Sequence, residues 1–310
     1  MTPEILVTGR VLPATRAALE RLFTVHLLPN GPARTEFLAA AGRTIRGIAG
    51  AAGADAALIA ALPNLEIIAN FGVGYDWVDV PAAKARGIPV TNTPDVLTDE
   101  VADLAMALIL DSARQISRAD RFVRAGKWLD GNFPLARTVA GRSLGIVGLG
   151  RIGMAIGRRA EAFRMQVLWH GPRPKPDVAW PFVADLLEIA RLADFLMVIC
   201  PLTPATRGLI SAEVLAALGP EGTLVNLARG AVVDEPALVE ALQSGTLGAA
   251  ALDVFSHEPH VPEALLTMDN VVLQPHLGSA TLETRTAMGQ VMIDNLAAHF
   301  DGRPLPNRVA

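Results

Sequence analysis

The chain has 310 residues, of which 51% are hydrophobic, and this length predicts two domains of ordinary size, each with its own buried core. A formal net charge of −4 provides no positive field for nucleic acid or for an anionic membrane surface, so both are disfavoured as partners. No apolar run approaches the ~20 residues that span a bilayer, and the N-terminus lacks the pattern of a cleaved signal. We therefore expect a cytoplasmic protein.

The chain contains one cysteine, Cys200, which excludes an internal disulfide and a multi-cysteine metal site. This agrees with a reducing compartment, and no metal is expected. Because Cys200 ends the apolar run in "DFLMVICPLTP", we interpret it as a buried residue at the end of a strand and not as a catalytic thiol.

The first part of the chain predicts a small α/β domain. Apolar runs of strand length alternate with segments of helical spacing almost throughout, which is typical of parallel sheets. Before residue 98, strands are expected at 4–9, 56–61, 66–72 and 88–94. A long helix is then predicted from Thr98, whose hydroxyl would cap the free N–H groups. It is expected to link the domains, and its apolar face consists of Val101, Leu104, Ala105, Leu108 and Ile109.

The second part of the chain predicts a Rossmann-type, doubly wound parallel sheet, in which ligands bind at the carboxyl ends of the strands. A last helix, roughly Thr281 to Phe300, would return the chain to the first domain. We therefore expect a discontinuous substrate-binding domain at 1–97 and 285–310, and a nucleotide-binding domain at 98–284. The six expected strands lie at 143–150, 166–171, 195–201, 222–230, 248–255 and 270–276.

The segment "GLGRIG" matches the GxGxxG pattern of dinucleotide-binding turns. Gly148 allows a tight turn, Gly150 lets the backbone approach a pyrophosphate, and Gly153 lets helix and strand pack closely. The segment follows an apolar strand and opens a helical pattern, which is the context that the motif requires. A dinucleotide is therefore the expected cofactor.

The second strand of this domain ends near His170, about twenty residues after Gly150, where an acidic residue would bind both ribose hydroxyls of NAD. No acid is present before Asp177, and Arg173 and Lys175 precede it. Because an arginine binds a 2′-phosphate that an acid would repel, the sequence predicts NADP(H). The chain is rich in arginine, so Arg173 as a solvated loop residue, and with it NAD(H), stays open.

Three residues that follow strands predict the chemistry. Arg229 lies in "NLARG", Glu258 in "LDVFSHEP" and His276 in "LQPHLGSAT". Reduction of a 2-keto acid needs a cation for the substrate oxygens, an acid that protonates the carbonyl oxygen, and a partner for that acid. A carboxylate on the far nitrogen of His276 would favour the protonated ring and fix its orientation. Glycines 72 and 74 in "NFGVGYDWVD" expose backbone donors, which predicts an anion site.

Seven segments together resemble the D-isomer-specific 2-hydroxyacid dehydrogenase family, and the resemblance covers nearly the whole chain. Within it, "TNTPDVLTDEVADL" and the basic loop most resemble the glyoxylate/hydroxypyruvate reductase branch, which prefers NADPH. The segments are "FGVGYDWVD", "VTNTPDVLTDEVADLAMALIL", "GIVGLGRIG", "PLTPATRGLI", "VNLARGAVVDEPAL", "ALDVFSHEP" and "LQPHLGSAT".

The resemblance implies a flavodoxin-like substrate domain, Arg229, Glu258 and His276 as the catalytic set, and a homodimer formed largely through the helix after Thr98. The implied substrate-binding residues are the backbone N–H groups of Val73 and Gly74, with Arg229 and His276, and Leu97 is a candidate wall of the pocket. Trp128, Asn132 and Phe133 are further candidates, from either subunit. The expected cofactor-binding residues are Gly148, Leu149, Gly150, Arg151, Ile152, Gly153, His170, Gly171, Arg173, Lys175, Cys200, Pro201, Thr206, Leu227, Ala228, Asp253 and Gly278.

Several alternatives remain open at this stage. The length disfavours the longer phosphoglycerate dehydrogenases, and the Glu258 and His276 pair disfavours the formate type, which uses a glutamine. Glyoxylate, hydroxypyruvate, pyruvate and phenylpyruvate differ only at C3 and beyond, so the substrate and the direction of flux are not fixed. A nucleotide-sensing corepressor of the same architecture is a candidate from another functional class.

Overall fold

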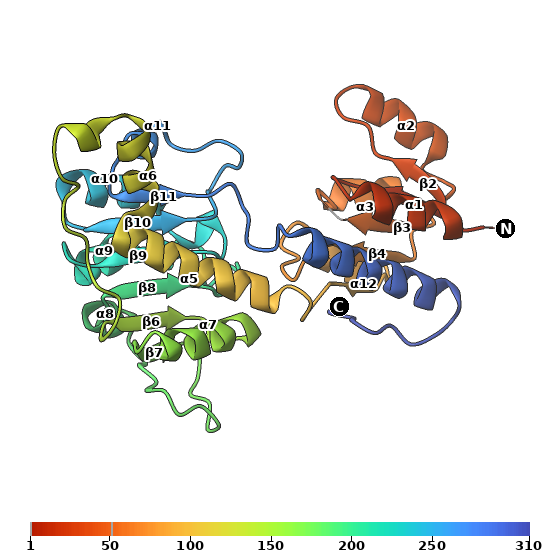
Figure 1. Cartoon of the computed structure of the whole chain (residues 1–310). Helices are drawn as coiled ribbons and strands as arrows, with labels where there is room; N and C mark the ends of the chain where they lie inside the picture. Colours follow the sequence, from red (N-terminus) through yellow and green to blue (C-terminus); the bar gives the residue numbers. More distant parts are fainter. Residues whose placement is uncertain (1, 51) are drawn as a thin grey trace. The chain divides into compact units, whose positions relative to one another are not determined.

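The computed structural model describes residues 2–50 and 52–310 and divides the chain into two compact units (Figure 1). Unit 1 comprises Met1–Leu97 and Ala280–Ala310, and unit 2 comprises Thr98–Ser279. Residues 280–284, expected in the nucleotide-binding domain, thus belong to unit 1, because Thr281 caps the last helix and belongs with it. No helix in the described part of the chain is long and apolar enough to cross a membrane.

Unit 1 contains a five-stranded parallel sheet in the order β2-β1-β3-β4-β5, which is the flavodoxin-like order. Its strands are β1 (Glu4–Val7), β2 (Thr24–Leu27), β3 (Ile45–Gly50), β4 (Ile67–Asn70) and β5 (Val90–Thr91). Its helices are α1 (Pro13–Leu22), α2 (Ala33–Ala41), α3 (Ala56–Ala61), α4 (Val80–Ala85) and α12 (Leu282–Phe300).

Apolar side chains cover both faces of this sheet, as a parallel sheet requires. Ile5 of β1 packs in a buried cluster with Leu19 of α1 and Leu296 of α12. Leu6, the next residue, points to the opposite face and packs in a cluster with Leu58 of α3. The carboxyl ends of the strands therefore stand at one edge of a sheet that is held on both sides.

The expectation of a strand at 56–61 is wrong, because this segment is the helix α3. The carboxylate of Asp55 accepts the N–H of Leu58 at 2.7 Å and caps the helix. A short apolar run rich in alanine has no periodicity that separates strand from helix, and alanine favours the helix. Strands β2 and β3 were not expected, since β2 is partly exposed and β3 contains two glycines.

Unit 2 contains a six-stranded parallel sheet in the order β11-β10-β9-β8-β6-β7, and all six strands lie where they were expected. The strands are β6 (Ser143–Val147), β7 (Gln166–His170), β8 (Phe195–Val198), β9 (Thr223–Asn226), β10 (Ala249–Leu252) and β11 (Val271–Leu273). The helical elements are α5 (Thr98–Arg114), α6 (Ile116–Arg124), η1 (Lys127–Leu129), α7 (Arg151–Ala162), α8 (Leu186–Leu192), α9 (Ala212–Leu218), η2 (Gly230–Val232), α10 (Glu235–Ser244) and α11 (Glu263–Leu266).

A single residue completes the Rossmann pattern at the outer edge of this sheet. Phe182 forms a parallel bridge with Trp169 of β7, and the N–H of Val183 donates to the carbonyl of Trp169 at 2.8 Å. With this bridge counted as the edge strand, the order around β6 becomes that of a dinucleotide-binding sheet. The topological switch point then lies between β6 and β8, where such sheets bind their ligands.

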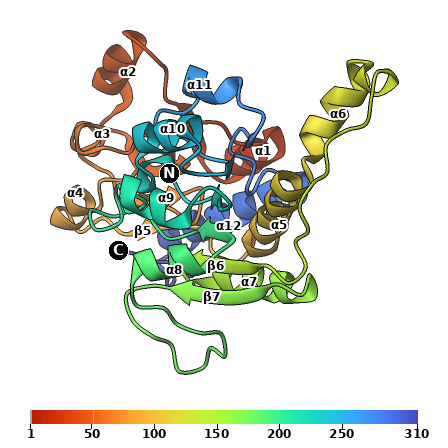
Figure 2. The same cartoon turned by 90° about the vertical axis from the view of Figure 1, so that its left-hand side faces the viewer.

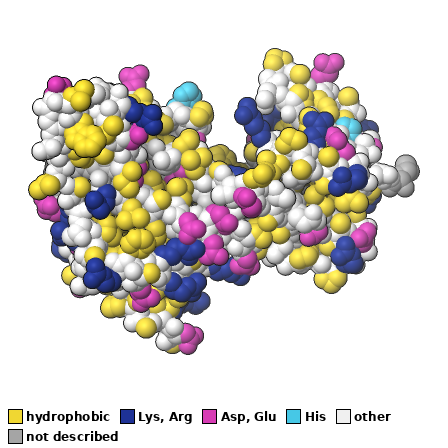
Figure 3. Space-filling model, viewed as in Figure 1, with side chains coloured by type: hydrophobic (Ala, Val, Ile, Leu, Met, Phe, Trp, Pro, Cys, Tyr) yellow, Lys and Arg dark blue, Asp and Glu magenta, His cyan; other side chains and the backbone are white. Residues whose placement is uncertain are grey.

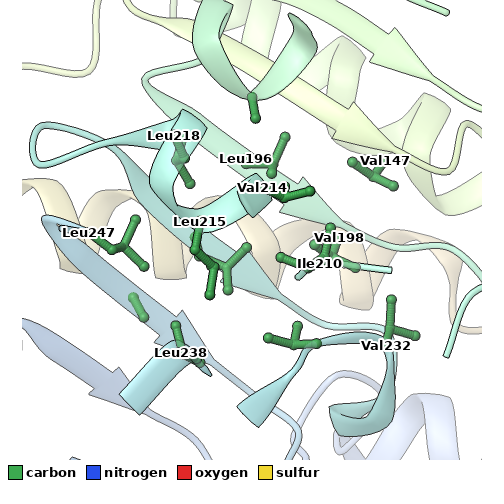
Figure 4. Close-up of a cluster of buried hydrophobic side chains, with 14 of the residues drawn as sticks. Val147, Leu196, Val198, Ile210, Val214, Leu215, Leu218, Val232, Leu238 and Leu247 are labelled. Carbon is green, nitrogen blue, oxygen red and sulfur yellow. The ribbon is translucent and has the colours of Figure 1, made fainter. Parts of the chain in front are cut away.

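The largest buried cluster of unit 2 lies between the sheet and the helices α8, α9 and α10 (Figure 4). Aliphatic side chains dominate it, and full burial of each such side chain contributes about 1.5 to 3 kcal/mol to folding. This cluster fixes the strand ends that carry the site. Its labelled members are Val147, Leu196, Val198, Ile210, Val214, Leu215, Leu218, Val232, Leu238 and Leu247.

Helix α5 packs with α7 on the other face of the sheet. Thr98 is the first residue of α5, so it lies inside the helix and not in the capping position before it. Arg159 of α7 holds the two helices together through Asp99 at 2.9 Å and Asp103 at 2.6 Å. On the face seen in Figure 3, basic side chains (Lys and Arg) are interspersed with carboxylates.

The segment of residues 115–137 forms an arm that carries α6 and η1 and extends beyond the sheet of its unit (Figure 2). Phe133 packs edge-on against Phe122 of the same arm, with ring centres 5.3 Å apart. Several other apolar side chains of the arm are open to solvent. Their exposed fractions are 54% for Ile116, 53% for Val123, 66% for Trp128, 92% for Leu129 and 99% for Leu135.

Candidate active site

The glycine-rich turn lies between β6 and α7, at the switch point. Gly148 has φ of +103°, and a Cβ atom there would lie 2.6 Å from the backbone nitrogen of Cys200. A Cβ at Gly153 would lie 2.5 Å from the carbonyl oxygen of Gly148, so both positions require glycine. A Cβ at Gly150 would meet no described atom within 4 Å.

Gly150 is the N-cap of α7, and the helix begins with Arg151, Ile152 and Gly153. The first N–H groups of a helix have no partner inside it, and the positive end of the helix dipole adds to their attraction for an anion. Open space above Gly150 leaves these donors accessible. The turn therefore fits the pyrophosphate of a dinucleotide, the group that the sequence predicts here.

The ends of β8 and β9 bring further predicted cofactor residues to the same edge. Cys200 is 8% exposed, and burial raises the pKa of its thiol to about 11, so the thiol stays neutral. Leu227 and Ala228 are also buried, whereas Pro201 is exposed. The hydroxyl of Thr206 donates to the carbonyl of Pro201 at 2.7 Å, and this hydrogen bond stabilises the loop that follows β8.

The basic loop after β7 is fixed at both ends. His170 closes β7, and its Nδ1 lies 3.0 Å from the carbonyl oxygen of Val183. At the far end the ring of Trp180 lies against Gly157 of α7, where a Cβ would come within 2.2 Å of it. Between these anchors Arg173 is exposed. The amine of Lys175 donates to the carbonyl of Leu149 in the glycine-rich turn, so the loop returns to the turn.

His276 and Glu258 form the predicted pair. Nδ1 of His276 lies 2.7 Å from Oε2 of Glu258, and the other carboxylate oxygen accepts the N–H of Phe255 at 3.1 Å. Burial acts to raise the pKa of Glu258. The hydrogen bond to His276, the charges of His276 and Arg229, and the Phe255 N–H together hold that pKa below its ordinary value. Glu258 is thus an ionised partner, and Nε2 of His276 makes no hydrogen bond to the described residues.

Arg229 is the third member of the set and is partly buried. Asn226, at the end of β9, shapes its turn, because its side chain accepts the N–H of Ala228 at 3.0 Å and donates to the carbonyl of Arg229 at 3.2 Å. A Cβ at Gly230 would lie 1.9 Å from the carbonyl carbon of Phe255. The turn of Arg229 is therefore in direct contact with the segment that leads to Glu258.

Sequence reasoning did not identify three residues that hold this set. Asn226 and Gly230 act as just described, and Glu235 accepts the N–H of Ser256 at 2.9 Å. The only sequence signal was their spacing within "VNLARGAVVDE", because their partners lie in another segment of the chain.

Asp253 lies at the end of β10 and is 2% exposed. Its carboxylate accepts the N–H groups of Leu277 at 2.6 Å and Gly278 at 2.9 Å. Burial raises the pKa of Asp253, although these N–H groups oppose the rise. A Cβ at Gly278 would lie 3.3 Å from the carboxylate, so the glycine makes room for Asp253 as well.

The turn at residues 71–74 of unit 1 presents backbone donors. The amide of Asn70 donates to the carbonyls of Gly72 at 2.9 Å and Gly74 at 3.0 Å, and the amide of Asn92 donates to that of Val73 at 3.0 Å. These carbonyls are therefore turned toward the protein. Within residues 2–50 and 52–310, the N–H groups of Val73 and Gly74 donate to no protein acceptor. Leu97, also of unit 1, is buried.

The remaining predicted residues lie on the arm. Trp128 and Asn132 are exposed, and Phe133 packs inside the arm beneath the guanidinium of Arg118, 5.6 Å from its ring centre. The described residues contain no group of three or more His, Cys, Asp or Glu side chains that could hold a metal ion.

Comparisons with known proteins bear on this arrangement. Residues 106–278 match the family model described as D-isomer specific 2-hydroxyacid dehydrogenase, NAD binding domain. The chain is 49% identical over 289 residues to glyoxylate/hydroxypyruvate reductase A of Arabidopsis thaliana, which covers 93% of this chain and 92% of that protein. It is also 49% identical to hydroxyphenylpyruvate reductase of Plectranthus scutellarioides, with the same coverage.

A solved structure resembles the whole chain. It is the NADPH-dependent glyoxylate/hydroxypyruvate reductase of Sinorhizobium meliloti in complex with NADP and malonate, which is 46% identical and has a TM-score of 0.96. The match covers 100% of this chain and 97% of that one.

Proposed function

Because this chain belongs to the D-isomer-specific 2-hydroxyacid dehydrogenase family, we propose that it reduces glyoxylate and hydroxypyruvate to D-2-hydroxy acids with NADPH. Membership makes it an NAD(P)-dependent oxidoreductase of small hydroxy or keto acids. The observation that carries the proposal is the 2.7 Å contact of His276 with an ionised Glu258, beside the charge of Arg229.

Each residue has a role that follows from its chemistry. The reduced nicotinamide supplies the hydride that the carbonyl carbon accepts. His276 donates the proton that the carbonyl oxygen takes up, from the nitrogen that Glu258 leaves available. Glu258 holds the imidazolium, and Arg229 stabilises the developing negative charge on the oxygen. The N–H groups of Val73 and Gly74 bind the substrate carboxylate.

The preference for NADPH over NADH rests on the loop after β7. His170 occupies the position where an acid would bind the ribose hydroxyls of NAD, and Arg173 is exposed at the loop that follows. A guanidinium binds a phosphate through two parallel hydrogen bonds, whereas a ribose hydroxyl offers no negative charge to it. The relative from Sinorhizobium meliloti binds NADP, which supports the same preference here.

The test measures kcat/KM for NADPH and NADH with glyoxylate, hydroxypyruvate and pyruvate. We expect turnover of glyoxylate and hydroxypyruvate with a clear NADPH preference. In Arg173→Gln, kcat/KM for NADPH should fall at least tenfold, while kcat/KM for NADH should not fall. Arg191→Gln on the exposed end of α8 is the matched control for the change in charge. NADH turnover equal to that with NADPH would remove the cofactor assignment, and no turnover of any 2-keto acid would favour the nucleotide-sensing function.

Larger aromatic 2-keto acids form a second candidate substrate class. The hydroxyphenylpyruvate reductase is as similar to this chain as the glyoxylate/hydroxypyruvate reductase, and phenylpyruvate differs from glyoxylate only beyond C2. Adding hydroxyphenylpyruvate and phenylpyruvate to the same assay separates the two substrate classes, because only the preferred class is expected to saturate the enzyme at low substrate concentration.

We further propose a homodimer that forms through the segment after Thr98, in which the arm of residues 115–137 follows α5 and contributes to the interface. Leu129 and Leu135 are 92% and 99% exposed, and apolar side chains grouped in this way favour a protein partner over water. A second copy of the arm is such a partner. The double variant Leu129→Asp, Leu135→Asp should elute as a monomer from size-exclusion chromatography, with its mass measured by light scattering. Leu266→Asp, on the exposed face of α11, should leave the mass unchanged.

The buried, solitary Cys200 agrees with a cytoplasmic location.

A further inference from the structure

Arg285 is a partly buried cation in the first turn of α12, within unit 1. Its guanidinium carbon lies 5.5 Å from the centre of the Phe71 ring. In the described part of the chain it makes no ion pair and no hydrogen bond through its side chain. Burial lowers the pKa of Arg285, which reflects the cost of holding a charge away from water.

Two other partly buried arginines of this protein have carboxylate partners. Arg46 contacts Glu66 at 2.6 Å, and Arg142 contacts Asp194 at 2.9 Å. Arg285 lacks such a partner and in addition stands near the N-terminus of a helix, where the dipole disfavours a positive charge. Glu283 precedes it in the same turn but is exposed and does not pair with it. A charge held under these conditions would be stabilised by an anionic ligand.

The position of Phe71 indicates which ligand. Phe71 follows β4 directly and begins the turn at residues 71–74, whose Val73 and Gly74 N–H groups donate to no acceptor in the described part of the chain. The amides of Asn70 and Asn92 hold the carbonyls of this turn, so the turn offers donors and no acceptors to a ligand. A cation on the ring of Phe71, the residue that leads into these N–H donors, adds to their attraction for an anion.

We propose that Arg285 is a substrate-positioning residue, for which the carboxylate bound at Val73 and Gly74 is the counter-ion. Phe71 connects the two, because its ring packs under the guanidinium and its backbone leads into the turn. The charge raises the affinity of the turn for carboxylates, and the stacked ring fixes its direction. The identity of the carboxylate as a 2-keto acid rests on the proposed function, whereas the anion affinity of the turn does not.

The test compares Arg285→Met, which keeps length and removes charge, with Arg285→Lys, which keeps charge. Malonate binding is measured by calorimetry and glyoxylate reduction by steady-state kinetics. In Arg285→Met the Kd for malonate and the KM for glyoxylate should rise roughly tenfold, with kcat changed less than about threefold, because loss of a unit charge near a bound anion weakens binding. Arg285→Lys should stay within about threefold of the parent protein in both constants.

Two further measurements separate charge from structure. The malonate Kd of the parent protein should rise with salt, and this slope should be smaller in Arg285→Met. Arg21→Met, on the exposed end of α1 at the opposite edge of the sheet, makes the same change in net charge and should alter neither constant. Circular dichroism checks that each variant is folded. If Arg285→Met does not fold, the salt dependence of malonate binding by the parent protein remains as the test.

The outcomes distinguish this inference from the proposed function. Unchanged malonate affinity in Arg285→Met, or an equal loss in Arg285→Lys, would overturn the role of the charge even if keto acids are reduced. Absence of malonate binding by the parent protein would overturn it as well. Weakened malonate binding in Arg285→Met, together with no keto acid turnover by the parent protein, would support the anion site and reject the reductase.

Discussion

Asp253 fixes the backbone of His276 and of the two residues after it. The carbonyl oxygen of Asp253 accepts the N–H of His276 at 2.9 Å, while its carboxylate accepts the next two N–H groups along the chain. His276 has φ of +56°, a conformation that side chains other than glycine rarely adopt. The three hydrogen bonds of Asp253 compensate for this strain and hold the imidazole toward Glu258.

Replacing Asp253 by asparagine should weaken this arrangement. The amide group of asparagine has one acceptor atom, so one backbone N–H would lose its partner or face another donor. We expect a loss of about 1 to 3 kcal/mol in the free energy of unfolding, measured in urea, and a lower kcat. Asp177→Asn, in an exposed loop, is the control, and equal stability of the two variants would contradict the role of Asp253.

His276→Asn should lower kcat by about 10²-fold or more, because a positioned acid contributes that much to proton transfer. Asparagine is chosen because it tolerates positive φ, so the backbone need not change. NADPH affinity, measured by fluorescence titration, should stay within about threefold of the parent value. Full turnover in this variant would remove His276 from the proton-transfer step.

Glu258→Gln should change the pH dependence of reduction. The pKa of Glu258 is below its ordinary value, so its stabilising charge is fully present above the ordinary pKa of a glutamate and is lost only as the pH falls through the lowered value. Across pH 5 to 9 Glu258 therefore stays ionised beside Nδ1 of His276. Removal of the charge should move the loss of kcat/KM at high pH to a lower pH, which a profile measured from pH 5 to 9 checks. An unchanged profile would mean that the pair is not electrostatically coupled.

Gly230→Ala should disrupt the contact between the turn of Arg229 and the segment that leads to Glu258. The added Cβ would lie 1.9 Å from the carbonyl carbon of Phe255, a distance that forces one backbone to move. We expect a loss of more than about 2 kcal/mol in the free energy of unfolding, with reduced activity. Gly131→Ala, where a Cβ meets no described atom within 4 Å, should change stability by less than about 0.5 kcal/mol.

Cys200 should react slowly with iodoacetamide in the folded protein. Burial raises its pKa to about 11, so at pH 8 almost no thiolate is present, and the thiolate is the reactive form. The stability that this neutral thiol contributes is present below the pKa of an unfolded cysteine and is lost as the pH rises toward 11. Labelling should therefore accelerate strongly in urea, and rapid labelling of the native protein would contradict the buried position.

The sequence predicted the parts of this protein that local patterns control. The strands of unit 2 were found because each is a continuous apolar run, and the glycine-rich turn because three glycines meet three separate steric needs. Residues 56–61 were misassigned because a six-residue alanine-rich run carries no period, and the cap at Asp55 was overlooked. The roles of Asn226 and Gly230 depend on contacts with distant segments, which no local pattern encodes. Arg285 was not considered, since its lack of a partner is a property of the folded chain.

The two anchors of the loop after β7 have a consequence for how cofactor preference can change. On one side the backbone of β7 is tied to Phe182 and Val183, and on the other the indole of Trp180 lies against Gly157 and donates to Glu161 at 2.8 Å. The stretch between them, residues 172–179, belongs to neither anchor, and it contacts the glycine-rich turn through the amine of Lys175. Residues 172–179 can therefore be replaced by another eight-residue segment while both anchors stay in place. A protein of this architecture can acquire a different nucleotide preference through such a replacement.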